Sequence, residues 1–259
     1  ACAFVHSWEL LLFFRFLQGC GAAALGVINV TLIGDLYKGI DRTAAMGYNA
    51  SVLSMGTAIY PALGGGLAVL GWKYPFLLPL LALVLGFIII FQLENPEPGE
   101  KTSLGQYFSA ALAELRQLEL IGLFLATLVT FILLYGPFIT YLPILMDDKF
   151  NVSAPKIGLL ISVASLSSAI VASQLGKLAL VILETTQIKI AFLLYALSCF
   201  LVPLVPGFKF LIIPALLFGS AQALAIPNIM TLLTSLVSMQ NRGAIMAVNG
   251  TVLRLGQTL

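Results

Sequence analysis

Long apolar runs joined by short polar connections make up most of the chain. Each run is long enough for an α-helix to cross a bilayer, which takes about 20 mostly apolar residues. None alternates between apolar and polar residues as a membrane-spanning strand does. The pattern predicts the tail of a helix at 1–5, seven complete spans, and a last span that starts at 241 and runs to the end of the chain. The seven spans are expected at 8–36, 43–70, 72–93, 118–146, 154–181, 187–206 and 209–238.

One connection is much longer than the others. Residues 94–117 open with the polar sequence ENPEPGEK and then place apolar residues, from Leu104 onward, at helical spacing. This pattern favours an amphipathic helix on the membrane surface, although a plain helical connector fits it equally well. The loops on the same side as this linker carry more Lys and Arg than the opposite loops, so that side is predicted to be cytoplasmic.

The composition agrees with a membrane protein and excludes other classes. Of 259 residues, 60% are hydrophobic and 9% are charged, and the mean hydropathy is +1.04. A soluble domain has about a quarter of its residues charged. The net charge of +2 is too small to indicate a nucleic-acid partner. The three cysteines show no C-x-x-C spacing, so we expect no metal and no cofactor.

The chain matches itself at an offset of 200 residues, without a gap. The clearest signal is the pattern R-x-x-x-M-x-x-N, which starts at Arg42 and again at Arg242. Counting spans across this offset gives six. A six-helix unit repeated in parallel and joined by a long cytoplasmic linker is the plan of a two-bundle secondary transporter. Other matched positions are Gly19, Ala23, Thr31 and Leu32 with Gly219, Ala223, Thr231 and Leu232, and Gly56 with Gly256.

The repeat leads to a predicted domain organisation. We expect the remnant of an N-terminal bundle at 1–93, a cytoplasmic linker at 94–117, and a C-terminal bundle at 118–259. If the whole protein has twelve helices, this chain begins at the end of the third and stops in the eleventh. The predicted fold class is therefore all-α, a two-bundle helical transporter truncated at both ends, with about eight to nine of twelve membrane helices.

Arg15 lies inside a predicted span, about two turns from its start. Placing a guanidinium within the membrane costs at least ~2.5 kcal/mol, so it needs a cavity or a polar partner. Its helical face continues through Gln18, Ala22, Gly26 and Asn29. We predict that this polar, small-residue face lines a central cavity. The alternative is that Arg15 extends to the membrane surface or holds neighbouring helices by hydrogen bonds.

The sequence around Arg15 resembles a known motif. Residues 11–23, LLFFRFLQGCGAA, are similar to the fourth-helix motif of the major facilitator superfamily, l-x-x-x-R-x-x-q-G-x-g-a-a. In proton-driven members this arginine is implicated in proton coupling, so the resemblance implies that role for Arg15. The matching positions are Leu11, Arg15, Gln18, Gly19, Gly21, Ala22 and Ala23.

The following span resembles a second motif of the same superfamily. Residues 56–66, GTAIYPALGGG, are similar to the fifth-helix motif g-x-x-x-G-P-x-x-G-G of its drug:proton antiporters, with Tyr60 in place of the usual glycine. Small residues allow close helix contact and a proline bends the helix, so this segment could seal or rock between the bundles. Generic tight packing is the alternative. The matching positions are Gly56, Pro61, Gly64 and Gly65.

Two further groups of residues are candidates for a substrate cavity. Tyr135 and Phe138 belong to a proline-containing aromatic stretch, and aromatic faces suit lipophilic or cationic substrates. An interfacial aromatic belt is the alternative. Gln222 and Asn228 lie on the repeat-related partner of the Arg15 span, where Arg15 itself is matched by Ala215.

Charged residues at the cytoplasmic ends of the spans are predicted to form helix caps and gate contacts. They are Asp35, Asp41, Arg42 and Arg242. The predicted spans contain no carboxylate near their centres. If protons are coupled, this absence leads us to expect the titratable carboxylate on a first or second helix that lies outside this chain.

The resemblance implies a proton-coupled exporter of small amphipathic compounds that works by alternating access in the membrane. Its partners would be the substrate, protons and the lipid bilayer. An importer or uniporter of a small metabolite, and a non-transporting receptor or scaffold of the same fold, are the alternatives. No enzymatic activity is expected, because no histidine or carboxylate cluster lies within the predicted spans.

Overall fold

The computed structural model describes residues 7–71, 73–74, 77, 80–92 and 117–259. All secondary structure in these residues is helical, as the long apolar runs predict. The prediction of a multi-pass helical membrane protein is thereby confirmed. Five of the described segments are long and apolar enough to cross a membrane: Trp8–Leu36, Leu118–Phe150, Lys156–Ser173, Glu184–Leu204 and Phe208–Leu236.

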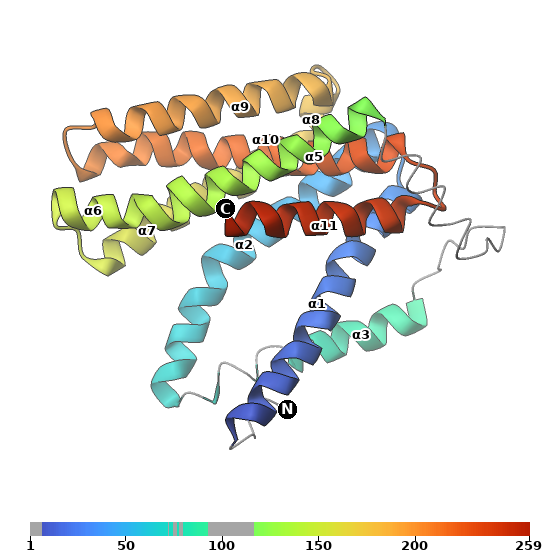
Figure 1. Cartoon of the computed structure of the whole chain (residues 1–259), viewed down its shortest axis with the longest axis horizontal. Helices are drawn as coiled ribbons and strands as arrows, with labels where there is room; N and C mark the ends of the chain where they lie inside the picture. The colour runs from blue at the N-terminus through green and yellow to red at the C-terminus, as the bar shows by residue number, and fades with distance from the viewer. Residues whose placement is uncertain (1–6, 72, 75–76, 78–79, 93–116) are drawn as a thin grey trace.

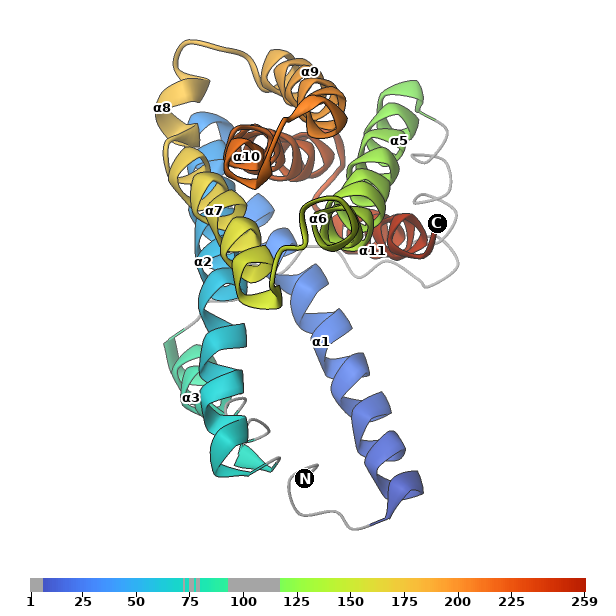
Figure 2. The same cartoon turned by 90° about the vertical axis from the view of Figure 1, so that its left-hand side faces the viewer.

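The N-terminal part contains α1 (Trp8–Leu36), α2 (Gly39–Leu70) and α3 (Leu81–Gln92). A two-residue connection joins α1 to α2, and Gly39 follows it with a φ of +54°, a conformation that glycine adopts without strain. This tight turn directs the start of α2 back against the end of α1. From there the two helices diverge, so that the start of α1 and the end of α2 extend away from the helices of the C-terminal part (Figures 1 and 2).

The C-terminal part is a compact bundle. It contains α5 (Leu118–Leu133), the π-helical segment η3 (Leu134–Tyr141), α6 (Leu142–Phe150), α7 (Ala154–Ser173), α8 (Leu175–Ala179), α9 (Glu184–Leu201), the 3₁₀ turns η4 (Val202–Leu204) and η5 (Phe208–Leu211), α10 (Ile212–Leu236) and α11 (Arg242–Thr258).

The segment η3 interrupts what would otherwise be one long α-helix. Pro137 has no backbone N–H and so cannot make the usual α-helical hydrogen bond. The backbone widens by one residue here: the N–H of Leu142 donates to the carbonyl of Pro137, five residues back. The Thr140 hydroxyl donates to the carbonyl of Tyr135 at 2.7 Å. The aromatic stretch is therefore a π-helical section within the longer helical segment.

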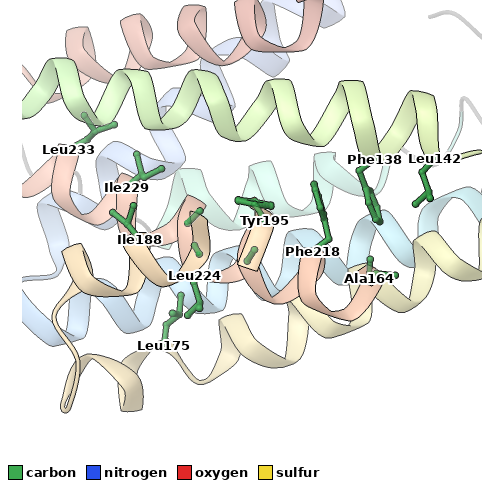
Figure 3. Close-up of a cluster of buried hydrophobic side chains, with 14 of the residues drawn as sticks. Phe138, Leu142, Ala164, Leu175, Ile188, Tyr195, Phe218, Leu224, Ile229 and Leu233 are labelled. Atoms are coloured by element: carbon green, nitrogen blue, oxygen red, sulfur yellow. The ribbon is translucent and has the colours of Figure 1, made fainter. Parts of the chain in front are cut away.

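Helix α10 forms the centre of the bundle. It packs against α7, α9, α5 and α2, and most of its side chains are buried (Figure 2). Phe218 on α10 stacks on Phe138 of η3 with ring centroids 4.2 Å apart, and Tyr195 of α9 meets it edge-on at 4.8 Å (Figure 3). These rings tie α9, α10 and η3 into one apolar core.

Gly219 sets the distance between α7 and α10, and Gly219→Ala is expected to destabilise the bundle. A Cβ at this position would lie 2.0 Å from the carbonyl oxygen of Ala164, and that backbone atom cannot move aside alone. Overpacking of this kind costs about 1–3 kcal/mol. A lower midpoint of thermal unfolding in detergent would show it. Gly158→Ala, on α7 with open space around the added Cβ, should leave the midpoint unchanged.

The structure modifies some predicted boundaries. The span expected at 154–181 divides into α7 and α8 at Gln174. Within the range 72–93, the described α-helix is Leu81–Gln92. The predicted amphipathic linker at 94–117 lies outside the described residues except for Gln117, which precedes α5. The predicted domain boundaries remain predictions.

Candidate functional site

Arg42 lies in the first turn of α2 and is 6% exposed. Its Nε donates to the carbonyl of Tyr37 at 2.9 Å, and its Nη2 donates to the carbonyl of Gly34 at 2.8 Å. The last carbonyls of a helix lack intrahelical partners and carry partial negative charge. Arg42 therefore satisfies the end of α1, within the same bundle.

Arg242, the repeat-related residue, lies at the start of α11 and donates to the end of the preceding helix, α10. It also donates to the end of α1 in the other bundle. Its Nε donates to the carbonyl of Thr234 at 2.8 Å, eight residues earlier, and the Nη2 of Arg42 donates in the same way to the carbonyl of Gly34. Its Nη1 donates to the Gly34 carbonyl at 2.9 Å and pairs with the Asp35 carboxylate at 2.5 Å. The Arg242 and Asp35 side chains are only 13% and 9% exposed.

These groups form what we call the arginine cluster: Gly34, Asp35, Arg42 and Arg242. Both guanidinium groups donate to the Gly34 carbonyl, and Arg242 also pairs with the Asp35 carboxylate. Burial and the nearby charge of Arg242 lower the pKa of Arg42, while Asp35 opposes this shift. Arg42 lies just before the predicted span, at the end of α2 that the loop charges predict to be cytoplasmic. An arginine remains protonated regardless. Asp35 therefore balances positive charge from both bundles.

A second set of polar contacts joins α2 to the C-terminal bundle. The Thr43 hydroxyl donates to the Glu184 carboxylate at 2.8 Å, and Ser51 donates to the carbonyl of Ala169 at 2.8 Å. Ser54 and Ser168 share a hydrogen bond of 3.0 Å. The hydroxyl groups lie along one face of α2, so this helix is held to α7 and the start of α9 over several turns.

Glycines allow these helices to touch. A Cβ on Gly47 would lie 2.5 Å from the carbonyl oxygen of Ala172, and a Cβ on Gly176 would lie 2.6 Å from the Cβ of Ala44. The first glycine is on α2 and the second is on α8. The two bundles are therefore in direct backbone contact on the side that the loop charges predict to be cytoplasmic.

Comparison with known proteins identifies the family of this chain. The family model described as Major Facilitator Superfamily matches residues 1–259. The chain belongs to the major facilitator superfamily. It is similar to Multidrug resistance protein 2 of Bacillus subtilis (strain 168), with 24% identity over 255 residues, which are 96% of this chain and 64% of that protein.

Two further superfamily relatives come from the same organism. Multidrug resistance protein 1 is 28% identical over 173 residues, or 62% of this chain and 42% of that protein. The multidrug transporter protein MdtP is 29% identical over 90 residues, or 34% of this chain and 17% of that protein. The chain thus spans less than two thirds of the length of these relatives.

The residues of the superfamily arginine motif lie on the part of α1 that extends away from the bundle. Arg15 is exposed and its Nη1 donates to Gln18 Oε1 at 3.1 Å. Asn29, one of the predicted cavity residues, donates to Asn49 Oδ1 on α2 at 2.9 Å. Arg15 and Gln18 are paired as neighbours on one helix face, whereas Asn29 helps to join α1 to α2.

Gly56 is the residue of the antiporter motif whose neighbours the structure describes. A Cβ added at Gly56 would lie 3.2 Å from the ring of Tyr60. Tyr60 is the residue that departs from the superfamily pattern, and in this chain its ring covers the space beside the glycine. Pro61, Gly64 and Gly65 fall within α2, but their surroundings lie outside what the structure describes. The role of this motif remains a prediction.

The predicted aromatic residues occupy different environments. Phe138 is 7% exposed and borders a cavity of about 310 Å³ between η3, α6, α9 and α10. Tyr141, Cys199 and Phe218 also line this cavity. Tyr135 stacks on Phe131 within its own helix, with centroids 6.4 Å apart. Phe138 is therefore both a core residue and a cavity residue, and a substrate role for either aromatic remains a prediction.

The predicted polar residues of α10 also differ from each other. Asn228 is fully buried, and its Nδ2 donates to Gln187 Oε1 on α9 at 3.0 Å and to the carbonyl of Leu224 at 2.8 Å. Gln222 is partly exposed. In this conformation Asn228 faces α9 inside the bundle. Its predicted role in a substrate cavity would require a different arrangement of the helices.

The predicted gate residues are only partly brought together. Arg42 and Arg242 meet at Gly34, but Asp41 is exposed, and within the described residues no recorded contact joins it to Arg242. Asp35 supplies the carboxylate. The repeat offset could have revealed the importance of its neighbour Gly34, since position 34 corresponds to position 234, the residue against which it packs.

Proposed function

We propose that the protein containing this chain is a proton-coupled exporter of small amphipathic compounds that works by alternating access. The observation that carries the proposal is the polar contact between the two repeat-related bundles, which in the described part of the chain lies at the end of α1 and along the first half of α2. It consists of an ion pair, hydrogen bonds and glycine contacts. Such contacts can break and re-form without exposing a large apolar core.

The shape of the molecule supports alternating access. The bundles meet near the end of α1 and the start of α2, whereas the start of α1 and the end of α2 lie apart from the C-terminal bundle (Figure 2). This is the arrangement expected of a transporter that is closed on its cytoplasmic side. Rocking of the bundles about a midplane site would break the cytoplasmic contacts and open that side.

The export of amphipathic compounds is supported by the relatives, whose names describe multidrug resistance and multidrug transport. The coupling to protons rests on the arginine motif around Arg15. Because an arginine stays charged, it would act on a titratable carboxylate by electrostatic attraction rather than by carrying the proton itself. We place that carboxylate on a helix of the protein outside this chain.

The transport direction is tested in everted membrane vesicles that contain the intact protein. An imposed gradient, acidic inside, should drive uptake of a lipophilic cationic dye into the vesicles, and dye addition should release protons from the lumen. Collapse of the gradient by a protonophore should stop the uptake. Dye uptake only with the opposite gradient would indicate an importer, and absence of any dye-dependent proton flux would favour a receptor or scaffold.

A further inference from the structure

Gly34 on α1 packs directly against Thr234 on α10. A Cβ on Gly34 would lie 2.8 Å from the Thr234 Cβ and 2.9 Å from its Cγ2. Thr234 is fully buried, so its side chain fills the space that a side chain at position 34 would need. The two residues are related by the repeat offset: residue 34 is touching its own image in the second bundle.

The packing of the helices shows the same relation. Under the offset, α1 corresponds to α10 and α2 corresponds to α11. The structure contains contacts of α1 with α11, of α2 with α10, and of α1 with α10. The repeat offset converts the contact of α1 with α11 into the contact of α10 with α2. It converts the contact of α1 with α10 into itself. Reciprocal contacts of this kind define a two-fold interface, and a residue that touches its image lies on the axis.

The hydrogen bonds at this point are symmetric in part. The bond from Arg42 to the Gly34 carbonyl and the bond from Arg242 to the Thr234 carbonyl are images of each other. The bond from Arg242 to Asp35 has no image, because Ser235 stands at the equivalent position and carries no charge. The guanidinium of Arg242 therefore binds residues of the other bundle, whereas that of Arg42 binds residues of its own bundle.

We infer that the contact between Gly34 and Thr234 is the on-axis point at which the two bundles close the cytoplasmic side, and that the size of residue 34 sets how closely they close. The inference rests on the proposed alternating-access function. A pathway between the bundles runs along their pseudo-two-fold axis, so a substrate cannot pass while these two residues touch. Gly34 is thus a positioning residue for the closed state.

Distances between spin labels test this in the intact protein in liposomes. With the native cysteines replaced by serine, labels at Lys38 and Gln240 report on the cytoplasmic ends of the two bundles, where both side chains are exposed. Gly34→Leu should raise the ratio of open to closed molecules roughly fivefold or more, because the bundles cannot approach. Gly122→Leu, on α5 with open space around the added Cβ, should leave the distances unchanged.

An exchange of the two residues tests the axis itself. Gly34→Thr alone should open the cytoplasmic side, whereas the double variant with Thr234→Gly should return the distances to those of the parent. A contact on the axis stays complementary when its two members are swapped. A double variant that stays as open as Gly34→Thr would overturn the on-axis placement, and Gly34→Leu with parental distances would overturn the closing role.

The outcomes do not depend on transport, since the distances are measured without substrate or gradient. If Gly34→Leu fails to fold, the smaller Gly34→Ala variant replaces it in the distance measurement. It should also raise the ratio of open to closed molecules. A protein that shows the predicted distance changes but no dye-dependent proton flux would contradict the proposed function and support the closing contact.

Discussion

Arg15→Ala in the intact protein is expected to abolish proton-driven dye transport while leaving membrane insertion unchanged. Arg15 is exposed on α1, so its side chain is not part of the packed core that the structure describes. A guanidinium within a few ångströms favours the ionised form of a carboxylate, and its removal raises the pKa of that carboxylate. The carboxylate would then hold its proton through the cycle. Initial rates of gradient-driven uptake in everted vesicles, normalised to protein amount, measure the effect.

Two variants separate coupling from structure. Arg15→Lys keeps the charge and should retain part of the activity, with a changed pH profile. Arg254→Ala removes an arginine that makes the same local contact, since Arg254 donates to Gln257 three residues on at 2.8 Å, as Arg15 does to Gln18. Arg254 lies outside the motif, and its variant should transport normally. Normal pH-driven transport by Arg15→Ala would remove the coupling role.

Much of the fold follows from patterns that the sequence displays directly. The apolar runs predict the helices because every backbone polar group in a bilayer must be satisfied within its own segment. The pattern R-x-x-x-M-x-x-N marks equivalent positions, and the structure gives both arginines the same hydrogen bond to the carbonyl eight residues earlier. The apolar pattern thus identifies the helices, and the repeat identifies residues that make equivalent hydrogen bonds in the two bundles.

The partners of the charged residues could not be predicted in the same way. Asp35 and Asp41 are six residues apart and both lie near a helix end. The tight turn at Gly39 orients them differently, so that Asp35 meets Arg242 and Asp41 faces solvent. Asn228 shows the same limit, because the repeat predicts its helix and a cavity role, whereas its neighbour Gln187 of α9 comes from the tertiary packing. Side-chain partners between helices depend on rotation and register, which local patterns do not encode.

Asp35→Ala is expected to open the cytoplasmic side of the protein and to reduce transport strongly. The variant removes the carboxylate that pairs with Arg242, and it leaves Arg42 and Arg242 close together without the nearby negative charge of Asp35. Removing one partner of such a poorly exposed pair costs about 2 kcal/mol or more. If the whole loss falls on the closed state, the ratio of closed to open molecules drops roughly thirtyfold. Spin-label distances between Lys38 and Gln240 measure this ratio.

Asp41→Ala is the matched control, because it removes the same charge from the other side of the same turn, at an exposed position in the first turn of α2. Equal effects of the two variants would mean that net charge, rather than the ion pair, holds the bundles together. Arg242→Ala should open the protein at least as far, since it also removes the bonds to Gly34 and Thr234. Combining it with Asp35→Ala should add little, because contacting partners are not additive. An additive double variant would show that the two residues act separately and that the closed state does not depend on their pairing.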